Sequence, residues 1–375
     1  MKERLEFSKK IKSNRGSITS FTLLSMLFFI IVLIAIYSTV SIKVQKQEKE
    51  LKSIESNYEN QDIDDTYEEK TNKKENWLVT QVNNGNIKIG SYIKYSPEVV
   101  DESKILELMT KLKKYSGSFN NTTSTLKQEK ELKWRILDVK NGEVRLISDK
   151  PTLSTIELNS YNGYNNAVKL IDEVCNELYW NERFTSKVQN LKIEDIEEKM
   201  VEKDLKKLNS DYDKTIDTIK HYYPSIVKKE KKQIIDGIEG KELKISEQTD
   251  YEKQEEILNA GELQIKITYW NKNMVEKDFE NSQYYELFMK KKSENYKKYW
   301  LSSRCINHYA GRAYFDIYTI EENNVESRSL YHSENAEGSF CYAFRPVVTL
   351  KYNIELNTNS EEDGITSESA YSIKK

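Results

Sequence analysis

The sequence predicts an α+β protein in which a single transmembrane helix and a stalk precede a large mixed head. Residues 17–42 contain no charged side chain, and a helix needs only about 20 apolar residues to cross the hydrocarbon core of a bilayer. The rest of the chain is polar, with a mean hydropathy of -0.76. Strand patterns cluster near both ends of residues 77–355, and helical patterns lie between them.

The basic side chains before the apolar run predict its orientation. Lys9, Lys10, Lys12 and Arg15 lie within a few residues of it, and positive charge usually stays on the cytoplasmic side. Residues 1–16 are therefore predicted to be a cytoplasmic basic segment and residues 17–42 a single span of the cell membrane. The head is then extracellular, and the membrane is a partner of the protein.

A second interpretation of the N-terminus stays open. Arg15-Gly16-Ser17 followed by a long apolar run resembles the start of prepilins and pseudopilins, in which a peptidase cuts after the glycine. The resemblance implies cleavage between Gly16 and Ser17. However, Phe21 stands where most prepilins have Glu, and the missing carboxylate disfavours assembly into a filament.

Three further segments are predicted from their composition. Residues 43–60 place apolar side chains at three- and four-residue spacings, typical of a short helical stalk that could pair with a second copy. Residues 61–76 carry many charges and few apolar side chains, so they are predicted to be a flexible linker. For the same reason residues 356–375 are predicted to be a disordered tail.

The head contains two hairpin patterns and a closing strand. Residues 133–139 and 143–148 flank Asn141-Gly142, a pair that tolerates the positive φ angles of a tight turn. Residues 313–320 and 325–331 flank a second turn at 321–324. Residues 347–350 follow Arg345-Pro346 and predict a strand with proline at its start.

Helices are predicted in the middle of the head. Residues 165–180 place apolar side chains, Cys175 among them, on one helical stripe, and residues 193–200 carry a shorter stripe. Residues 202–298 are mostly charged and are interpreted as a helical insertion lying over or beside the sheet.

The side chains that carry chemistry are few. His221, His308 and His332 are the three histidines, and none has a metal-ligand spacing to another histidine or to a cysteine. Ser302, Ser303 and Cys305 could act as nucleophiles, but no base can be assigned to them from spacing. No phosphate-binding loop or dinucleotide motif is present. A net charge of -3 with alternating lysines and acids argues against a nucleic-acid surface. The sequence thus predicts no catalytic residues, no metal and no cofactor.

Two cysteines have alternative interpretations. Outside a cell, Cys305 and Cys341 could form a disulfide that stabilises the head by about 3 kcal/mol. Two free buried thiols are the other interpretation, and the sequence does not decide between them.

Three motifs resemble those of an uncharacterised bacterial domain found in clostridia and related Gram-positive bacteria. They are Lys133-Trp134-Arg135-Ile136-Leu137, Tyr299-Trp300-Leu301-Ser302-Ser303-Arg304 and the run from Phe344 through Arg345 and Pro346 to Leu350. That domain is similar to the C-type-lectin-like fold of formylglycine-generating enzymes. The resemblance implies a lectin-like head over residues 77–355, in which Trp134, Arg135, Trp300, Arg304, Arg345 and Pro346 have structural roles. The two tryptophans would be core residues, and Arg304 and Arg345 would hold loops through forked hydrogen bonds.

These observations favour a membrane-anchored cell-surface protein whose non-enzymatic head recognises an extracellular protein or glycan. A pilin-like structural subunit carrying the same head is the first alternative. An extracellular enzyme with an unrecognised site is the second, and it would be favoured by polar side chains converging in a pocket near Arg304.

Overall fold

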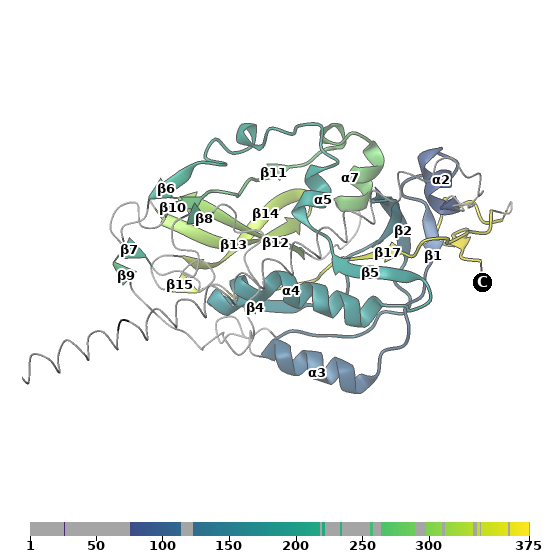
Figure 1. The fold of residues 1–375 in the computed structure, drawn as a ribbon, viewed down its shortest axis with the longest axis horizontal. Coiled ribbons are helices and arrows are strands. Elements are labelled where there is room, and N and C mark those ends of the chain that lie inside the picture. Colours follow the sequence, from purple (N-terminus) through teal and green to yellow (C-terminus); the bar gives the residue numbers. More distant parts are fainter. Residues whose placement is uncertain are drawn as a thin grey trace, which may run out of the picture. The chain divides into compact units, whose positions relative to one another are not determined.

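The computed structural model divides the chain into two compact units, Met1–Lys73 and Lys74–Lys375. It describes residues 26, 76–113, 123–217, 220–221, 233–234, 256–257, 264–289, 298–309, 312–332, 336–337, 339–358 and 361–374. Met26 apart, the description below therefore concerns the second unit (Figure 1).

The predicted transmembrane architecture is corrected by the structure. Among the described residues, no helix combines the length and the apolar character that a membrane crossing requires. The described residues form an α+β fold, and nothing in them supports the predicted single membrane span or the membrane as a partner. The predicted span at 17–42 (except Met26), the Gly16–Ser17 cleavage site, the stalk and the linker up to residue 75 lie outside the described residues.

A six-stranded sheet forms the centre of the second unit, with the strand order β18-β1-β2-β3-β17-β5. Its strands are β1 (Tyr92–Lys94), β2 (Trp134–Lys140), β3 (Glu143–Ser148), β5 (Thr185–Asn190), β17 (Pro346–Leu350) and β18 (Tyr371–Ser372). The predicted β2–β3 hairpin is confirmed. Its turn residues Asn141 and Gly142 have φ angles of 52° and 74°, the left-handed region that Asn and Gly tolerate best. The predicted closing strand is also confirmed as β17, which lies between β3 and β5.

A second sheet has five strands, and its long hairpin was also predicted correctly. It consists of β11 (Lys272–Asn273), β12 (Tyr299–Tyr309), β13 (Arg312–Glu321), β14 (Asn324–His332) and β15 (Ala336–Glu337). Glu322, at φ 61°, lies in the turn between β13 and β14. The smaller sheets pair β4 (Ile156–Asn159) with β16 (Ser339–Tyr342), β6 (Thr215–Asp217) and β8 (Gln233–Ile234) with β10 (Gln264–Lys266), and β7 (Lys220–His221) with β9 (Glu256–Ile257).

The described α-helices of this unit are α2 (Trp77–Asn83), α3 (Glu102–Leu112), α4 (Ser160–Tyr179), α5 (Ile193–Glu197) and α7 (Ser282–Phe288), with single turns of 3₁₀ helix at Leu205–Lys207 and Glu276–Asp278. The predicted helix at 165–180 is confirmed as α4. The helical interpretation of residues 202–298 holds in the described part only for α7 and the two 3₁₀ turns, and short strands form most of its other regular structure. This segment has too few apolar side chains to give a long helix a continuous buried stripe, and short strands form there instead.

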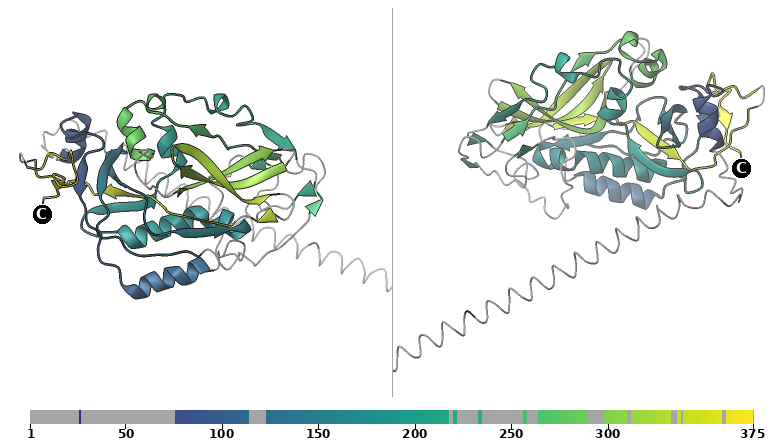
Figure 2. Two further views of the ribbon diagram at one scale, coloured as in Figure 1. Left: turned by 180° about the vertical axis from the view of Figure 1, so that it is seen from behind. Right: turned by 45° about the horizontal axis from the view of Figure 1, so that its top comes forward.

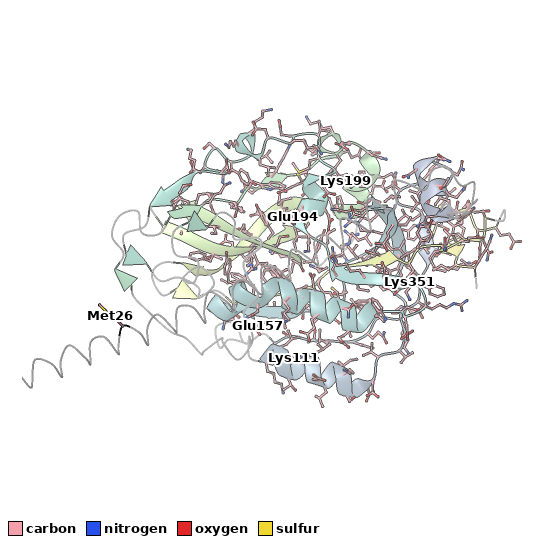
Figure 3. The ribbon with its side chains drawn as sticks, in the orientation of Figure 1. Met26, Lys111, Glu157, Glu194, Lys199 and Lys351 are labelled. Atoms are coloured by element: carbon pink, nitrogen blue, oxygen red, sulfur yellow. The ribbon has the colours of Figure 1, made fainter. Side chains whose placement is uncertain are left out.

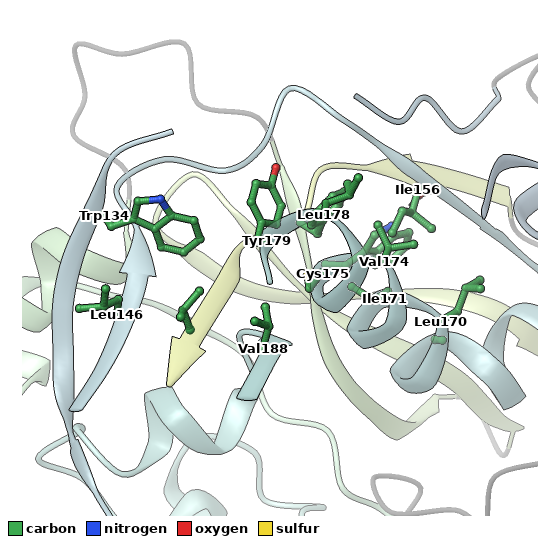
Figure 4. Close-up of a cluster of buried hydrophobic side chains, with 14 of the residues drawn as sticks. Trp134, Leu146, Ile156, Leu170, Ile171, Val174, Cys175, Leu178, Tyr179 and Val188 are labelled. Atoms are coloured by element: carbon green, nitrogen blue, oxygen red, sulfur yellow. The ribbon is translucent and has the colours of Figure 1, made fainter. Parts of the chain in front are cut away.

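The core has two clusters, one on each face of the six-stranded sheet. On one face, α4 packs against Trp134, Leu146 and Val188 (Figure 4). On the other face, Ile147 and Val347 pack against α5 and β12. This division follows from the alternation of side chains along a strand, since Leu146 and Ile147 point to opposite faces. Both views in Figure 2 show α3 on the outer side of α4, where Lys111 pairs with Glu173 at 2.5 Å.

The C-terminal tail is ordered where the structure describes it, so the predicted disorder of residues 356–375 is wrong. β18 pairs in parallel with β1, and Leu356 and Tyr371 are buried. The unit consequently extends past the predicted end of the head at residue 355. A few apolar side chains are enough to order the tail, because the edge of β1 can pair with β18 as a further strand.

Replacing Gly364 by Ala is expected to destabilise the protein more than replacing Gly142 by Ala. Both glycines have positive φ angles, 66° and 74°, which cost an alanine about 1 kcal/mol. A Cβ on Gly364 would also lie 2.7 Å from Cδ2 of Tyr371, whereas a Cβ on Gly142 would have open space around it. Urea unfolding of the two variants measures the difference. Equal losses would contradict the packing of the tail against β1.

Candidate functional site

A cavity of about 610 Å³ lies between the six-stranded sheet, α5 and β12. We call it the charged pocket, because most of its lining side chains are ionisable or polar. They are Lys140, Asn141, Glu143, Arg145, Val168, Lys187, Gln189, Lys192, Glu194, Asp195, Ser302, Arg304 and Thr349. Glu194, labelled near the middle of Figure 3, marks its position in the molecule.

One row of side chains across the sheet contributes Arg145, Thr349 and Lys187 to the floor of the charged pocket. Arg145 on β3 is opposite Asp138 on β2 and Thr349 on β17, and Thr349 is opposite Lys187 on β5. Directly opposed residues of antiparallel strands project from the same face. Four strands therefore present Asp138, Arg145, Thr349 and Lys187 side by side.

Arg145 is the most heavily bonded group of this row. Its Nε and Nη2 donate to the two carboxylate oxygens of Asp138 at 2.7 and 2.6 Å, and Nη1 donates to Oδ1 of Asp195 at 2.6 Å. Burial alone would lower the pKa of Arg145, but these carboxylates raise it instead. Burial likewise opposes ionisation of Asp138, yet the bonds from Arg145 keep its pKa below the ordinary value. Both groups therefore stay charged, and the guanidinium ties α5 to the sheet.

The β5 end of the charged pocket is different because its cations lack such partners. Lys187 is exposed and Lys192 half-buried, and no described carboxylate forms an ion pair with either. Arg304 on β12 is buried, and its Cζ lies 5.7 Å from the centre of the Tyr164 ring. Three cationic side chains thus line this end. The two lysines lie near enough to Asp172 to oppose the rise in its pKa, but neither forms an ion pair with a described carboxylate.

A bulge in β12 brings two serines next to carboxylates. The pairing of β12 with β13 shifts register between Trp300 and Arg304. Ser302 Oγ donates to Asp172 Oδ1 at 2.8 Å, and Ser303 Oγ donates to Glu194 Oε2 at 3.0 Å. Burial raises the pKa of both Asp172 and Glu194. The possible nucleophiles are therefore hydrogen-bonded to carboxylates, and no histidine is among the residues that line the pocket.

The predicted structural residues lie largely outside the charged pocket. Trp134 and Trp300 are buried in the first core cluster, and Trp300 Nε1 donates to the Ile156 carbonyl at 2.8 Å. Arg345 forms the expected fork, with Nε and Nη2 both donating to the Ser148 carbonyl, and Pro346 begins β17. Arg135 Nε donates to the Gly90 carbonyl at 2.7 Å. Of the six residues, Arg304 is the one that lines the charged pocket.

The possible disulfide between Cys305 and Cys341 is corrected to two free thiols. Cys305 is buried on β12 opposite Asp316. Cys341 is on β16 opposite Glu157, and its Sγ donates to the Thr123 carbonyl at 3.5 Å. The two cysteines belong to different sheets with different neighbours, a separation that chain spacing could not reveal.

No group of three or more His, Cys, Asp or Glu side chains in the described ranges could hold a metal ion. Comparison of the chain with family models, curated proteins and solved structures gives no match. The function is therefore inferred from the charged pocket itself.

The other pocket residues had no sequence signal of their own. Arg145 and Lys187 are ordinary members of charged strands, and they come together only through the register of β3, β17 and β5. Two of the three motifs gave a useful signal, since Ser302 and Arg304 of the YWLSSR motif and Thr349 of the run from Phe344 to Leu350 all line the cavity.

Replacing Arg145 by Met is expected to lower the free energy of unfolding by about 3 kcal/mol or more, because two buried carboxylates lose their cation. Lys187→Met is the matched control and should change stability by less than about 0.5 kcal/mol, since Lys187 is exposed and without an ion pair. Chemical denaturation measures both. A loss of similar size in the two variants would contradict the different roles assigned to these cations.

The carboxyl group of Glu197 is expected to make stability fall as the pH rises from about 5 to 8. Burial raises the pKa of Glu197 from 4.5 to about 7, against the lowering effect of the hydrogen bond that Trp270 Nε1 donates to Oε1 at 2.6 Å. The folded state then holds a proton that the unfolded chain has released, so this contribution is complete below pH 4.5 and lost above pH 7. A shift of this size corresponds to about 1–3 kcal/mol.

Glu197→Gln should remove that part of the pH dependence, and urea unfolding at several pH values measures it. Glu276→Gln, at an exposed glutamate without an ion pair in the described structure, serves as the control and should keep the wild-type slope. If E197Q also kept the wild-type slope, the buried environment of Glu197 would be contradicted.

Proposed function

We propose that this protein is a non-enzymatic recognition protein whose charged pocket binds an acidic ligand. The observation that carries the proposal is the set of cations at the β5 end of the pocket, where Lys187 and Lys192 have no described ion-pair partner. An anionic group placed between them would gain favourable Coulomb energy without having to break an existing ion pair.

The size and lining of the cavity support this proposal. Its volume of about 610 Å³ lies within the range of roughly 300–1,000 Å³ that small-molecule sites occupy. Gln189 and Thr349 on the floor add neutral hydrogen-bonding groups beside Lys187. The rigid sheet and the Arg145 ion cluster hold these groups in place before any ligand arrives, which reduces the entropy lost on binding.

The state of the two serines favours binding over catalysis. A serine nucleophile needs a base that accepts its proton, and imidazole usually fills this role. Ser302 and Ser303 instead donate to Asp172 and Glu194. His308, at the far end of β12, lies with Nδ1 3.9 Å from an Asp211 carboxylate oxygen. The enzymatic alternative is favoured by one observation, the convergence of polar side chains near Arg304, but no histidine is among the residues that line the pocket.

Replacing both Lys187 and Lys192 by glutamate, which reverses their charge, is expected to abolish ligand binding. The full chain would be screened against carboxylates, phosphates, acidic oligosaccharides and acidic peptides, and the K187E/K192E variant should lose at least tenfold in affinity for every acidic hit. K88E/K277E is the charge-matched control, because Lys88 and Lys277 are exposed lysines outside the pocket. Binding to the wild type should also weaken with added salt. Acidic hits that bind both variants equally, or a screen without any acidic hit, would contradict the proposal.

A further inference from the structure

Two half-buried carboxyl groups lie beside the lysines of the charged pocket. Asp172 Oδ1 on α4 accepts hydrogen bonds at 2.8 Å from Ser302 Oγ and from the Asn190 backbone N–H. Glu194 Oε2 on α5 accepts a hydrogen bond at 3.0 Å from Ser303 Oγ. Ser302 and Glu194 themselves line the cavity. The bulge of β12 therefore holds both carboxyl groups next to the cavity.

The two lysines of the pocket act on these carboxyl groups. Lys192 caps the start of α5, and Glu194 belongs to the first turn of that helix. Burial raises the pKa of Glu194, and its hydrogen bonds and Lys192 oppose this rise. Burial likewise raises the pKa of Asp172, against its hydrogen bonds and the charges of Lys192 and Lys187. The positive charge that favours an anion in the pocket thus also favours the ionised forms of Asp172 and Glu194.

An acidic ligand adds a further negative charge to this cluster. A like charge nearby disfavours the ionised form of a carboxyl group, and the effect is larger where burial lowers the local dielectric constant. An anion held by Lys187 and Lys192 also offsets the positive charge that these lysines present to Asp172 and Glu194. Both effects favour the protonated form of the two carboxyl groups once a ligand is bound.

The other ionisable groups around the cavity come from α4, α5, β12 and the β2–β3 hairpin. They are Cys175 on α4, Asp195 and Glu197 on α5, Arg304 on β12, and Lys140, Glu143 and Arg145 on the hairpin. Asp195 has a cation as its partner, because Arg145 donates to it at 2.6 Å. Asp172 and Glu194 are instead bonded to serine hydroxyl groups, which can donate to a carboxylate or accept from a protonated carboxyl group.

We propose that the charged pocket takes up a proton on Asp172 or Glu194 when it binds its acidic ligand, so that binding tightens as the pH falls. This inference rests on the proposed function and specifies its regulation by pH. The proton comes from water and forms an O–H bond with a carboxylate oxygen, and the neighbouring serine oxygen accepts the new hydrogen bond. Because the bound state holds more protons than the free state, affinity rises as the proton concentration rises.

Calorimetric titration of the full chain with sodium sulfate tests the inference at a low and a neutral pH, with the ionic strength held constant by chloride. Sulfate is the probe because it does not change its own charge between these conditions, so any pH dependence belongs to the protein. We expect sulfate to bind at least about threefold more tightly at about pH 5 than at about pH 7.5. In lightly buffered solution, sulfate should also cause an uptake of acid that sodium chloride does not cause.

The D172N/E194Q variant keeps the shape of both side chains and removes their acidity. Its affinity for sulfate should not change with pH. E276Q, at an exposed glutamate outside the pocket, is the control and should keep the wild-type pH effect. A pH effect that persists in D172N/E194Q, or that disappears in E197Q, would overturn the assignment of the proton. The uptake of acid by the wild type is measured without any variant, so it remains decisive if D172N/E194Q does not fold.

The outcomes separate this inference from the proposed function. Sulfate that binds the wild type equally at both pH values, without uptake of acid, and fails to bind K187E/K192E would overturn the proton linkage and leave recognition of an anion intact. If sulfate does not bind the wild type at either pH, the linkage is overturned as well, and the acidic-ligand screen separately decides the proposed function.

Discussion

The interaction on which the site depends is the buried ion cluster of Arg145 with Asp138 and Asp195. Removing these charges from water costs several kcal/mol for each ion, and the cost is offset only when all bonds have good geometry. Here Asp138 receives two parallel bonds from the guanidinium and a contact from Lys199 at 2.9 Å. Because Asp195 belongs to α5, the cluster fixes that helix over the sheet.

The rest of the unit keeps the two faces of the six-stranded sheet distinct. Apolar side chains on one face pack against α4, and those near Ile147 on the other pack against α5 and β12. The second face also holds the charged row, and Arg145, Thr349 and Lys187 of that row line the charged pocket. The bulge in β12 then brings Ser302 and Arg304 to that space. Charged and apolar side chains therefore share this face of the sheet.

The local features of this fold were predictable from sequence, whereas the tertiary ones were not. Asn141-Gly142 predicts its turn through backbone conformation alone, and the stripe that includes Cys175 predicts α4 through its period. Arg345 also forms the forked bonds that its family resemblance implied. The membrane helix predicted at 17–42 has no counterpart among the described residues, and the tail and the charged insertion form strands that were not foreseen. These strands depend on partners distant in the chain, such as β1 for Tyr371, and short polar segments carry no period that reveals such pairing.

The charged pocket was even harder to predict from the sequence. Its floor joins Arg145, Lys187 and Thr349, which are widely spaced in the chain and meet only through strand register. A crystal structure of the full chain grown with an acidic hit from the ligand screen is the most direct test of the account. We predict the ligand in the cavity, its anionic group against Lys187 and Lys192, with Arg145 still bonded to Asp138 and Asp195. A ligand bound elsewhere, or an Arg145 side chain turned away from Asp195, would contradict it.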